Sequence, residues 1–266
     1  MRTPGVFATH FLLAVVDAMQ PIVASSKAEL LSQLRRIDIS VPPRGDGRTT
    51  EHSERWSICR LLSTLAEAQV LRYPIELEHR DRPDFVLTQG GELIGIEFTE
   101  AIPANWAWAN AKREENAYDN FIPLQKFVPG EPLRTADEVD AIARGTNWGD
   151  GWVGDAPERQ WSDAMLHFAI GKAKKLAHPG FTPYAHNWLL IYDNWPLPAL
   201  EEEVAARHFA SKLAFVATPF ERIFVECTQH MCKGQHSMFQ TLSDHLSFTG
   251  SNRPQAAGRG RRENFQ

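Results

Sequence analysis

Cysteine is scarce in this chain. Only Cys59, Cys227 and Cys232 occur among 266 residues. Three scattered thiols are too few for the framework of disulfide bonds that stabilises small secreted domains. The scarcity is typical of a protein of the reducing cytoplasm, and a cytoplasmic location is the expectation.

Long hydrophobic runs are also lacking. The most apolar stretch, residues 6–24, is interrupted by His10 and Asp17, and its unbroken part is shorter than the roughly 20 residues that a transmembrane helix needs. We expect it to form an amphipathic helix packed on the body, within an N-terminal helical segment of residues 1–38. No membrane partner is expected.

Several common catalytic motifs are absent. The sequence contains no G-x-x-x-x-G-K-[ST] phosphate loop, no dinucleotide-binding fingerprint and no G-x-S-x-G nucleophile elbow. The net charge of −5 excludes a protein coated in basic surface, but it leaves room for a locally basic cleft that binds nucleic acid.

What the chain does contain is a regular succession of short elements. Apolar periodicity predicts a helix from Ser53 to about Leu71, with Ser53 as its N-cap. The glycine-rich "QGG" at 89–91 predicts a hairpin turn between two strands. In chain order, the elements expected after the first helix are strands at 73–79, 83–88 and 93–101, a helix at 161–178, a strand at 187–195, a helix at 200–215 and a strand at 220–228.

This order predicts an α/β (α+β) fold with a mixed sheet and helices on both faces. Three strands before a crossover helix indicate an antiparallel meander, and the later strand–helix–strand order indicates a parallel addition. We expect a main domain at 53–250 after a linker at 39–52, and an irregular insertion with some helix of its own at 103–160. The basic segment 251–266 is expected to be a disordered tail.

Two acids interrupt the apolar strands of the expected hairpin, Asp84 and Glu97. Unpaired charge is excluded from strand interiors because burying a carboxylate costs roughly several kcal/mol. If the register sets these two side chains on one face, they repel each other unless a cation lies between them. Oxygen ligands with open positions suit Mg²⁺, which keeps some of its waters. The alternative is that both acids are bonded to nearby arginines, Arg80 or Arg82.

The residues around these acids resemble the PD-(D/E)XK nuclease superfamily. Pro83-Asp84 begins one strand, and Glu97-Phe98-Thr99 on the next corresponds to the acid-x-Lys motif. The element order over about residues 53–195 is similar to the family's αβββαβ core. The resemblance implies a restriction-endonuclease-like fold and an Mg²⁺-dependent endonuclease, with Mn²⁺ as a possible substitute, that acts on DNA rather than RNA. Asp84, Glu97 and the Phe98 carbonyl would hold the metal, and a double-strand cut would need a homodimer.

Threonine stands at Thr99 where the family has lysine, so another element would have to supply the cation. On the helix 161–178, Lys172 points with the apolar stripe, Lys175 lies beside it and Lys174 points toward solvent. Lys172 first and Lys175 second are therefore candidates for the displaced lysine, with Thr99 hydrogen-bonding at the vacated position. The alternative is a solvated basic patch that complements the helix dipole.

Glu54 continues the buried stripe of the first helix and, by the same resemblance, would complete the metal shell. Its alternative role is a first-turn acid that favours the helix dipole. Glu100 is expected to be peripheral, because it points to the face opposite Glu97. Asp193 is expected to cap the end of a strand.

Three further interpretations stay open. The segment 227–236, "CTQHMCKGQH", offers two cysteines and two histidines for a zinc-stabilised interaction protein, although its spacing matches no usual zinc site. The tryptophans of the insertion would stack on bases or anchor the insertion to the body. Loss of the family lysine would fit a non-catalytic module that keeps the nuclease fold to bind nucleic acid or a protein partner.

Overall fold

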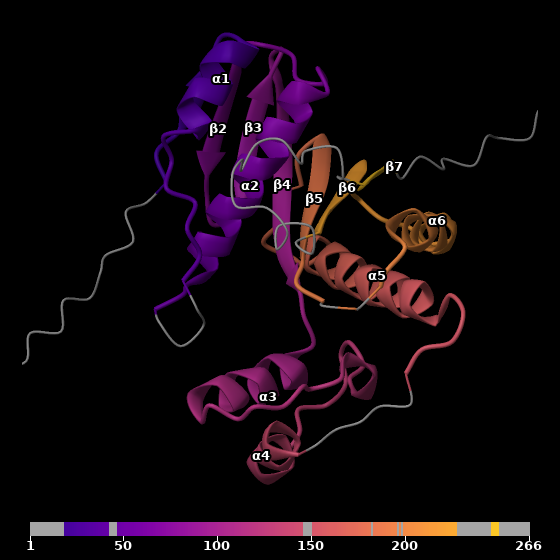
Figure 1. Cartoon of the computed structure of the whole chain (residues 1–266). Coiled ribbons are helices and arrows are strands. Elements are labelled where there is room, and N and C mark those ends of the chain that lie inside the picture. Colours follow the sequence, from indigo (N-terminus) through magenta and orange to yellow (C-terminus); the bar gives the residue numbers. More distant parts are fainter. Residues whose placement is uncertain are drawn as a thin grey trace, which may run out of the picture.

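A sheet of seven strands, in the order β1 to β7, forms the centre of the described part of the protein (Figure 1). The computed structural model describes residues 19–42, 47–145, 151–181, 183–195, 197, 199–227 and 246–249. The strands are β1 (Ile22–Ala24), β2 (Ile75–His79), β3 (Phe85–Gln89), β4 (Glu92–Ala101), β5 (His186–Asp193), β6 (Arg222–Cys227) and β7 (Leu246–Thr249). The helices are α1 (Lys27–Leu34), α2 (Thr50–Glu67), α3 (Ala104–Glu115), the 3₁₀ turn η1 (Leu124–Lys126), α4 (Ala136–Arg144), α5 (Ala156–Leu176) and α6 (Glu202–Leu213).

The sheet is mixed, as the sequence predicts. Strands β1 to β4 are antiparallel neighbours, β4, β5 and β6 are parallel, and β7 returns antiparallel to β6. The β3–β4 hairpin turns at Gly90 and Gly91, whose φ angles are 56° and 79°. Glycine adopts such positive φ values readily, which is why "QGG" predicts the turn correctly.

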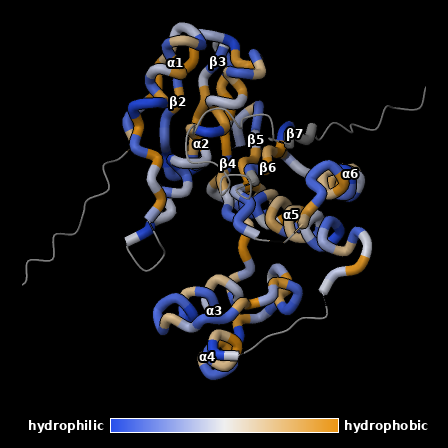
Figure 2. The backbone as a smooth tube through the Cα atoms, in the orientation of Figure 1, coloured by the Kyte–Doolittle hydropathy of each residue, from blue (hydrophilic) through white to orange (hydrophobic). Residues whose placement is uncertain are grey.

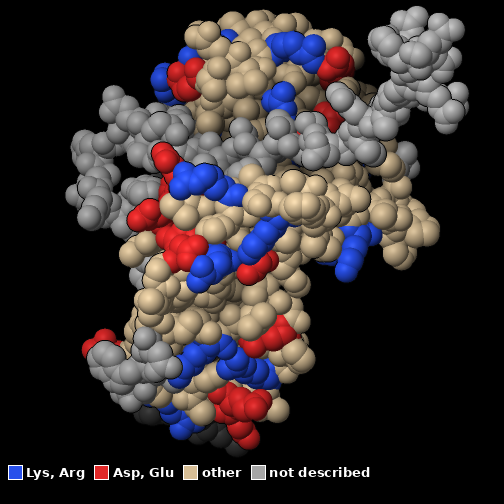
Figure 3. All heavy atoms as spheres, turned by 90° about the vertical axis from the view of Figure 1, so that its right-hand side faces the viewer, with Lys and Arg blue, Asp and Glu red and all other residues tan. Residues whose placement is uncertain are grey.

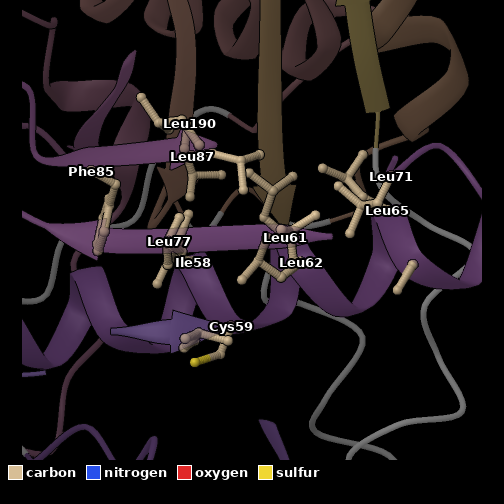
Figure 4. Close-up of a cluster of buried hydrophobic side chains, with 14 of the residues drawn as sticks. Ile58, Cys59, Leu61, Leu62, Leu65, Leu71, Leu77, Phe85, Leu87 and Leu190 are labelled. Atoms are coloured by element: carbon tan, nitrogen blue, oxygen red, sulfur yellow. The ribbon is translucent and has the colours of Figure 1, made fainter. Parts of the chain in front are cut away.

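Helices α1 and α2 cover one face of the sheet. Ile58, Leu61 and Leu62 of α2 are almost fully buried against Leu77 and Leu87 of the sheet (Figure 4). Burying one such side chain contributes roughly 1.5–3 kcal/mol, so this face makes a large part of the core. Hydrophobic residues stand out along β4 in Figure 2.

The start of α2 differs from the prediction. The helix begins at Thr50 with Thr49 as its N-cap, one turn before Ser53. The Thr49 amide donates a hydrogen bond to Nδ1 of His52 at 3.1 Å, and this local bond ends the linker early. Ser53 lies inside the helix and is buried.

Helices α5 and α6 cover the opposite face. Trp161, Met165 and Ala169 of α5 pack with Phe209 of α6 over β5 and β6. Helices therefore lie on both faces, and the expected crossovers are present: α5 precedes β5, and α6 joins β5 to β6. None of the described helices is long and apolar enough to cross a membrane.

The insertion is more regular than the sequence suggests. Helices α3 and α4 pack through a small core of Ala109, Ile122, Phe127 and Val139. They stand beyond the end of β4 in Figure 1. The prediction that the insertion has some helix of its own is therefore confirmed, but the polar sequence does not give the bounds of the helices, because their shared core buries few side chains.

Near the N-terminus, the helix expected up to residue 24 is wrong for Ile22–Ala24. These residues form β1, which pairs with β2 from Ile22 opposite Leu77 to Ala24 opposite Ile75. Burial alternates along them, since Val23 is 52% exposed between two buried neighbours. Residues 19–21 of the expected helix are not helical either, whereas the rest of it, residues 6–18, and the tail 251–266 lie outside the described residues.

Candidate active site

The candidate site lies where β4 extends beyond its pairing with β3. The last β3–β4 pair sets Phe85 opposite Ile96, so the next step of the register sets Asp84 opposite Glu97. In place of a backbone bond, the Asp84 carboxylate accepts a hydrogen bond from the Phe98 amide at 2.6 Å. Asp84 is therefore held against β4 by its side chain. The sequence predicted it within the strand, but β3 begins only at Phe85.

Two further residues shape this edge. Gly95 leaves room for the ring of Pro83, since a Cβ on Gly95 would lie 3.2 Å from Pro83 Cγ and 3.0 Å from Tyr184. Pro83 precedes Phe85, the last residue of β3 that pairs with β4, and proline has no N–H to donate to the sheet. Because the N–H and C=O of one strand residue point to the same side, the Phe98 carbonyl faces the side on which Asp84 lies.

Lys172 of α5 joins the two carboxylates. Its Nζ donates to Oδ2 of Asp84 at 3.1 Å and to Oε2 of Glu97 at 2.8 Å. The two oxygens can be no farther apart than the sum of these distances. The lysine side chain is 15% exposed and that of Glu97 only 6%. The helical periodicity of α5 thus identifies the lysine that faces the sheet, and a solvated patch is the wrong description of Lys172.

Burial and charge shift the pKa values of this group. Burial raises the pKa of Glu97, although the ammonium of Lys172 opposes the shift and the nearby Asp84 adds to it. Burial alone would lower the pKa of Lys172, but the attraction of Asp84 and Glu97 outweighs it and the net shift is upward. Lys172 therefore keeps its proton at neutral pH.

The donor set fits a hard divalent cation. Oε1 of Glu97 is buried and has no hydrogen-bond partner among the described residues, which leaves a carboxylate oxygen unsatisfied. Mg²⁺ binds proteins through oxygen ligands, often one or two carboxylates, and keeps several of its waters. Two carboxylates and a carbonyl beside open space would provide such ligands and leave room for the waters. No group of three His, Cys, Asp or Glu side chains that could hold a metal occurs in the part of the chain that the structure describes.

A pocket of about 470 Å³ opens beside these groups. Thr99 and Lys175, both expected at the site, line it, whereas Lys174 does not. Thr99 is half-buried and Lys175 is exposed. The lining residues come from the start of α2, the edge of β4 and the last turns of α5, and they are Arg48, Thr49, Thr50, Ser53, Glu54, Asp84, Phe98, Thr99, Glu100, Lys172 and Lys175.

Glu54 also lines this pocket, and it has a hydrogen-bond partner that the sequence did not predict. Its Oε2 is bonded to Nε2 of His79 at 2.9 Å, and this bond, against the effect of burial, raises the pKa of His79. Glu54 is in the second turn of α2, and the acid of the first turn is Glu51. The first-turn dipole role is therefore wrong for Glu54.

Glu100 is not peripheral, contrary to the expectation from strand alternation. It lines the pocket and accepts hydrogen bonds from Arg48 at 3.2 Å and from Asn194 at 2.6 Å. Arg48 also donates to Ser53. Sequence reasoning missed Arg48 because it stands in a segment that resembles a plain linker, and the only signal was its position just before a helix start.

The arginines proposed as partners for the acidic pair are bonded elsewhere. Arg80 pairs with Glu78, and Arg82 lies 3.6 Å from Asp81. The ion-pair alternative with Arg80 or Arg82 is therefore wrong.

Asp193 has the structural role that was expected. Its carboxylate accepts hydrogen bonds from the Trp161 indole at 2.6 Å and from the Trp195 amide at 2.9 Å.

Trp161 is fully buried, and the Trp106 indole donates to the Ile122 carbonyl at 3.2 Å. Trp106, Trp152 and Trp161 pack against the core beside α5, which favours anchoring over base stacking. Trp148 lies outside the described residues.

Basic and acidic groups intermingle on the face that carries α5 and α6 (Figure 3). Lys212 pairs with Asp163 at 2.5 Å, and Arg159 pairs with Asp155. This face is therefore not a uniformly basic surface.

Cys232, His230 and His236, the residues of the alternative zinc site, lie outside the described residues. Comparison of the chain with protein-family models, with curated proteins and with solved structures finds no match in any of the three. Since a fold alone does not define a function, what the chain does has to be inferred from the site.

Proposed function

We propose that the protein is a metal-dependent nuclease that hydrolyses phosphodiester bonds, in DNA rather than RNA. The observation that supports it is the convergence of Asp84 and Glu97 on the Nζ of Lys172 at the edge of a pocket. An ammonium beside a pair of carboxylates is a costly arrangement to bury, and such arrangements are concentrated at functional sites.

Asp84, Glu97 and the Phe98 carbonyl would hold Mg²⁺ or Mn²⁺. The cation would supply Lewis acidity, which makes a nearby water more acidic and offsets charge on the phosphate. The buried, unpartnered Oε1 of Glu97 supports this assignment, because it is an oxygen that needs a positive partner.

Lys172 would act as a proton-bearing donor. Because its pKa is raised, it holds its proton and can orient the attacking water or a phosphoryl oxygen, but it does not readily accept a proton. In the reaction, the water oxygen forms the new P–O bond, the ester P–O bond breaks and the departing oxygen leaves with a proton. One water is consumed for each bond cut.

The element order also supports the proposal. Helix α2, strands β2 to β4, helix α5 and strand β5 follow one another as in a restriction-endonuclease-like core, interrupted by the α3–α4 insertion. Thr99, which borders the pocket where that family has lysine, would contribute a hydroxyl to the phosphate. Cutting both strands of a duplex would require a homodimer with two such sites.

Cleavage of labelled DNA with and without Mg²⁺ tests the proposal. Asp84→Asn keeps an oxygen for the Phe98 amide, and Glu97→Gln keeps the side-chain shape, so both should fold normally. Each should lower the Mg²⁺-dependent rate at least about a hundredfold. Asp163→Asn, an exposed acid of α5 outside the pocket, is the matched control and should cut at the normal rate.

If the wild type cuts no DNA or RNA but binds them, the non-catalytic module is the better description. If the double variant of Asp84 and Glu97 cuts as fast as the wild type, the activity belongs to another site or to a contaminant.

A further inference from the structure

Among the charged side chains that line the pocket, all of the acids have a basic partner, but one of the lysines has no acidic partner among the described residues. Each acid of the lining has a basic partner, and the pairs are Glu100 with Arg48, Asp84 with Lys172, and Glu54 with His79. Lys175 also lines the pocket, but it has no hydrogen-bond or ion-pair partner among the described residues. One ammonium therefore faces the pocket without a counter-charge.

Lys175 follows Lys172 by three residues on α5. Residues three apart lie on the same side of a helix and are separated by about 4.5 Å along its axis. Consecutive phosphates of one strand follow one another at a short, regular interval. A strand whose reacting phosphate lies beside Lys172 can therefore bring a neighbouring phosphate within reach of Lys175, one helical turn away.

We propose that Lys175 binds a second phosphate of the nucleic-acid strand, adjacent to the phosphate that is cleaved beside Asp84 and Lys172. The inference rests on the proposed function and specifies its substrate: a chain with at least two consecutive phosphates. Thr49 and Thr50, at the start of the 18-residue helix α2, border the same pocket and add hydroxyl groups at a helix end that favours anions.

Lys174 provides a matched control. It is the neighbouring residue on the same helix, it is exposed, and it does not line the pocket. Replacing it removes the same charge from the molecule. An effect of Lys175→Gln that Lys174→Gln does not share is therefore due to position and not to net charge.

The test is a binding cycle with short thymidine oligonucleotides, measured in EDTA so that no cleavage intervenes. TpT carries one phosphate, whereas pTpT and TpTp carry a second phosphate on the 5′ or the 3′ side. For the wild type, one of these two additions should tighten binding about tenfold, as expected for a charge-assisted contact. The gain should disappear in Lys175→Gln and persist in Lys174→Gln.

A parallel titration uses a longer single-stranded oligonucleotide. Lys175→Gln should lower the slope of log affinity against log salt by roughly 0.7, the value for one phosphate contact to a single strand, and Lys174→Gln should leave it unchanged. The inference is overturned if neither terminal phosphate tightens binding, or if both variants lose the gain equally. Because these measurements need no cleavage, a protein that fails to cut DNA yet shows the gain loses the proposed function but keeps the phosphate site.

Discussion

Lys172 sets the charge balance of the site. Without it, the carboxylates of Asp84 and Glu97 would be two negative charges close together. Water could screen them little, because Glu97 is only 4% exposed. Its Nζ is within hydrogen-bonding distance of both carboxylates, which favours the charged form of the lysine. The side chain thus holds the acids together and presents a donor to the pocket.

Lys172→Met should therefore change the cleavage rate and the affinity for Mg²⁺ in opposite directions. The cleavage rate should fall on the order of a hundredfold, because a positioned proton donor is lost. The affinity for Mg²⁺ should rise, because the carboxylates lose the competing positive charge. Single-turnover cleavage across an Mg²⁺ titration measures both quantities in one experiment.

Lys174→Met is the control for this variant and should match the wild type. Equal and small losses of rate in the two variants would contradict a role for Lys172 in the reaction.

The sequence could predict Lys172 but not Arg48. Lys172 continues a buried helical stripe with Met165 and Leu176, and such periodicity is visible without any structure. The contacts of Arg48 with Glu100 and of His79 with Glu54 join segments that are far apart in the sequence, and no periodic pattern predicts them.

At the scale of elements, α2 meets β6 through a buried pair of titratable side chains, Arg60 and Glu226. Glu226 is 1% exposed, and its Oε1 lies 2.5 Å from Nε of Arg60 on α2. Burial nevertheless outweighs the attraction of Arg60 and raises the pKa of Glu226 to about 8. The native protein therefore holds a proton here that the unfolded chain, with an ordinary carboxyl, releases at lower pH.

This shift predicts a pH dependence of stability. Between the ordinary pKa of 4.5 and about 8, the native state binds more protons than the unfolded state, so the free energy of unfolding falls as the pH rises. Glu226→Gln cannot ionise and should lack this loss. From pH 6 to pH 9 the wild type should lose on the order of 2 kcal/mol relative to the variant.

Urea unfolding of both proteins at the two pH values measures the difference. Parallel behaviour of the wild type and Glu226→Gln would mean that Glu226 is ionised throughout and that its pairing with Arg60 offsets the burial.

Element types were easier to predict than element ends. The stripe of Ile58, Leu61 and Leu62 predicts α2, but its start at Thr50 depends on a cap formed by His52. Ile22–Ala24 was expected to be helical, because an apolar run has the same composition in a buried helix and in a short strand. Pairing with β2, which lies about fifty residues later in the chain, decides the outcome.

At the scale of the whole molecule, the order of strands and helices was sufficient to predict a mixed sheet with both faces covered. Right-handed crossovers and short connections leave few arrangements for such an order. The α3–α4 insertion follows no comparable rule, because its elements pack chiefly on each other. The pocket itself depends on β4 extending past β3, since β4 continues to Ala101 while the pairing of the two strands ends at Phe85 and Ile96.

The central claim is that Asp84 and Glu97 hold a divalent cation, and calorimetric titration of the protein with Mn²⁺ tests it most directly. The wild type should bind a cation at this site, Glu97→Gln should lose that binding, and Glu203→Gln, an exposed acid of α6, should retain it. Absence of binding to the wild type, or equal binding to all three proteins, would contradict the claim.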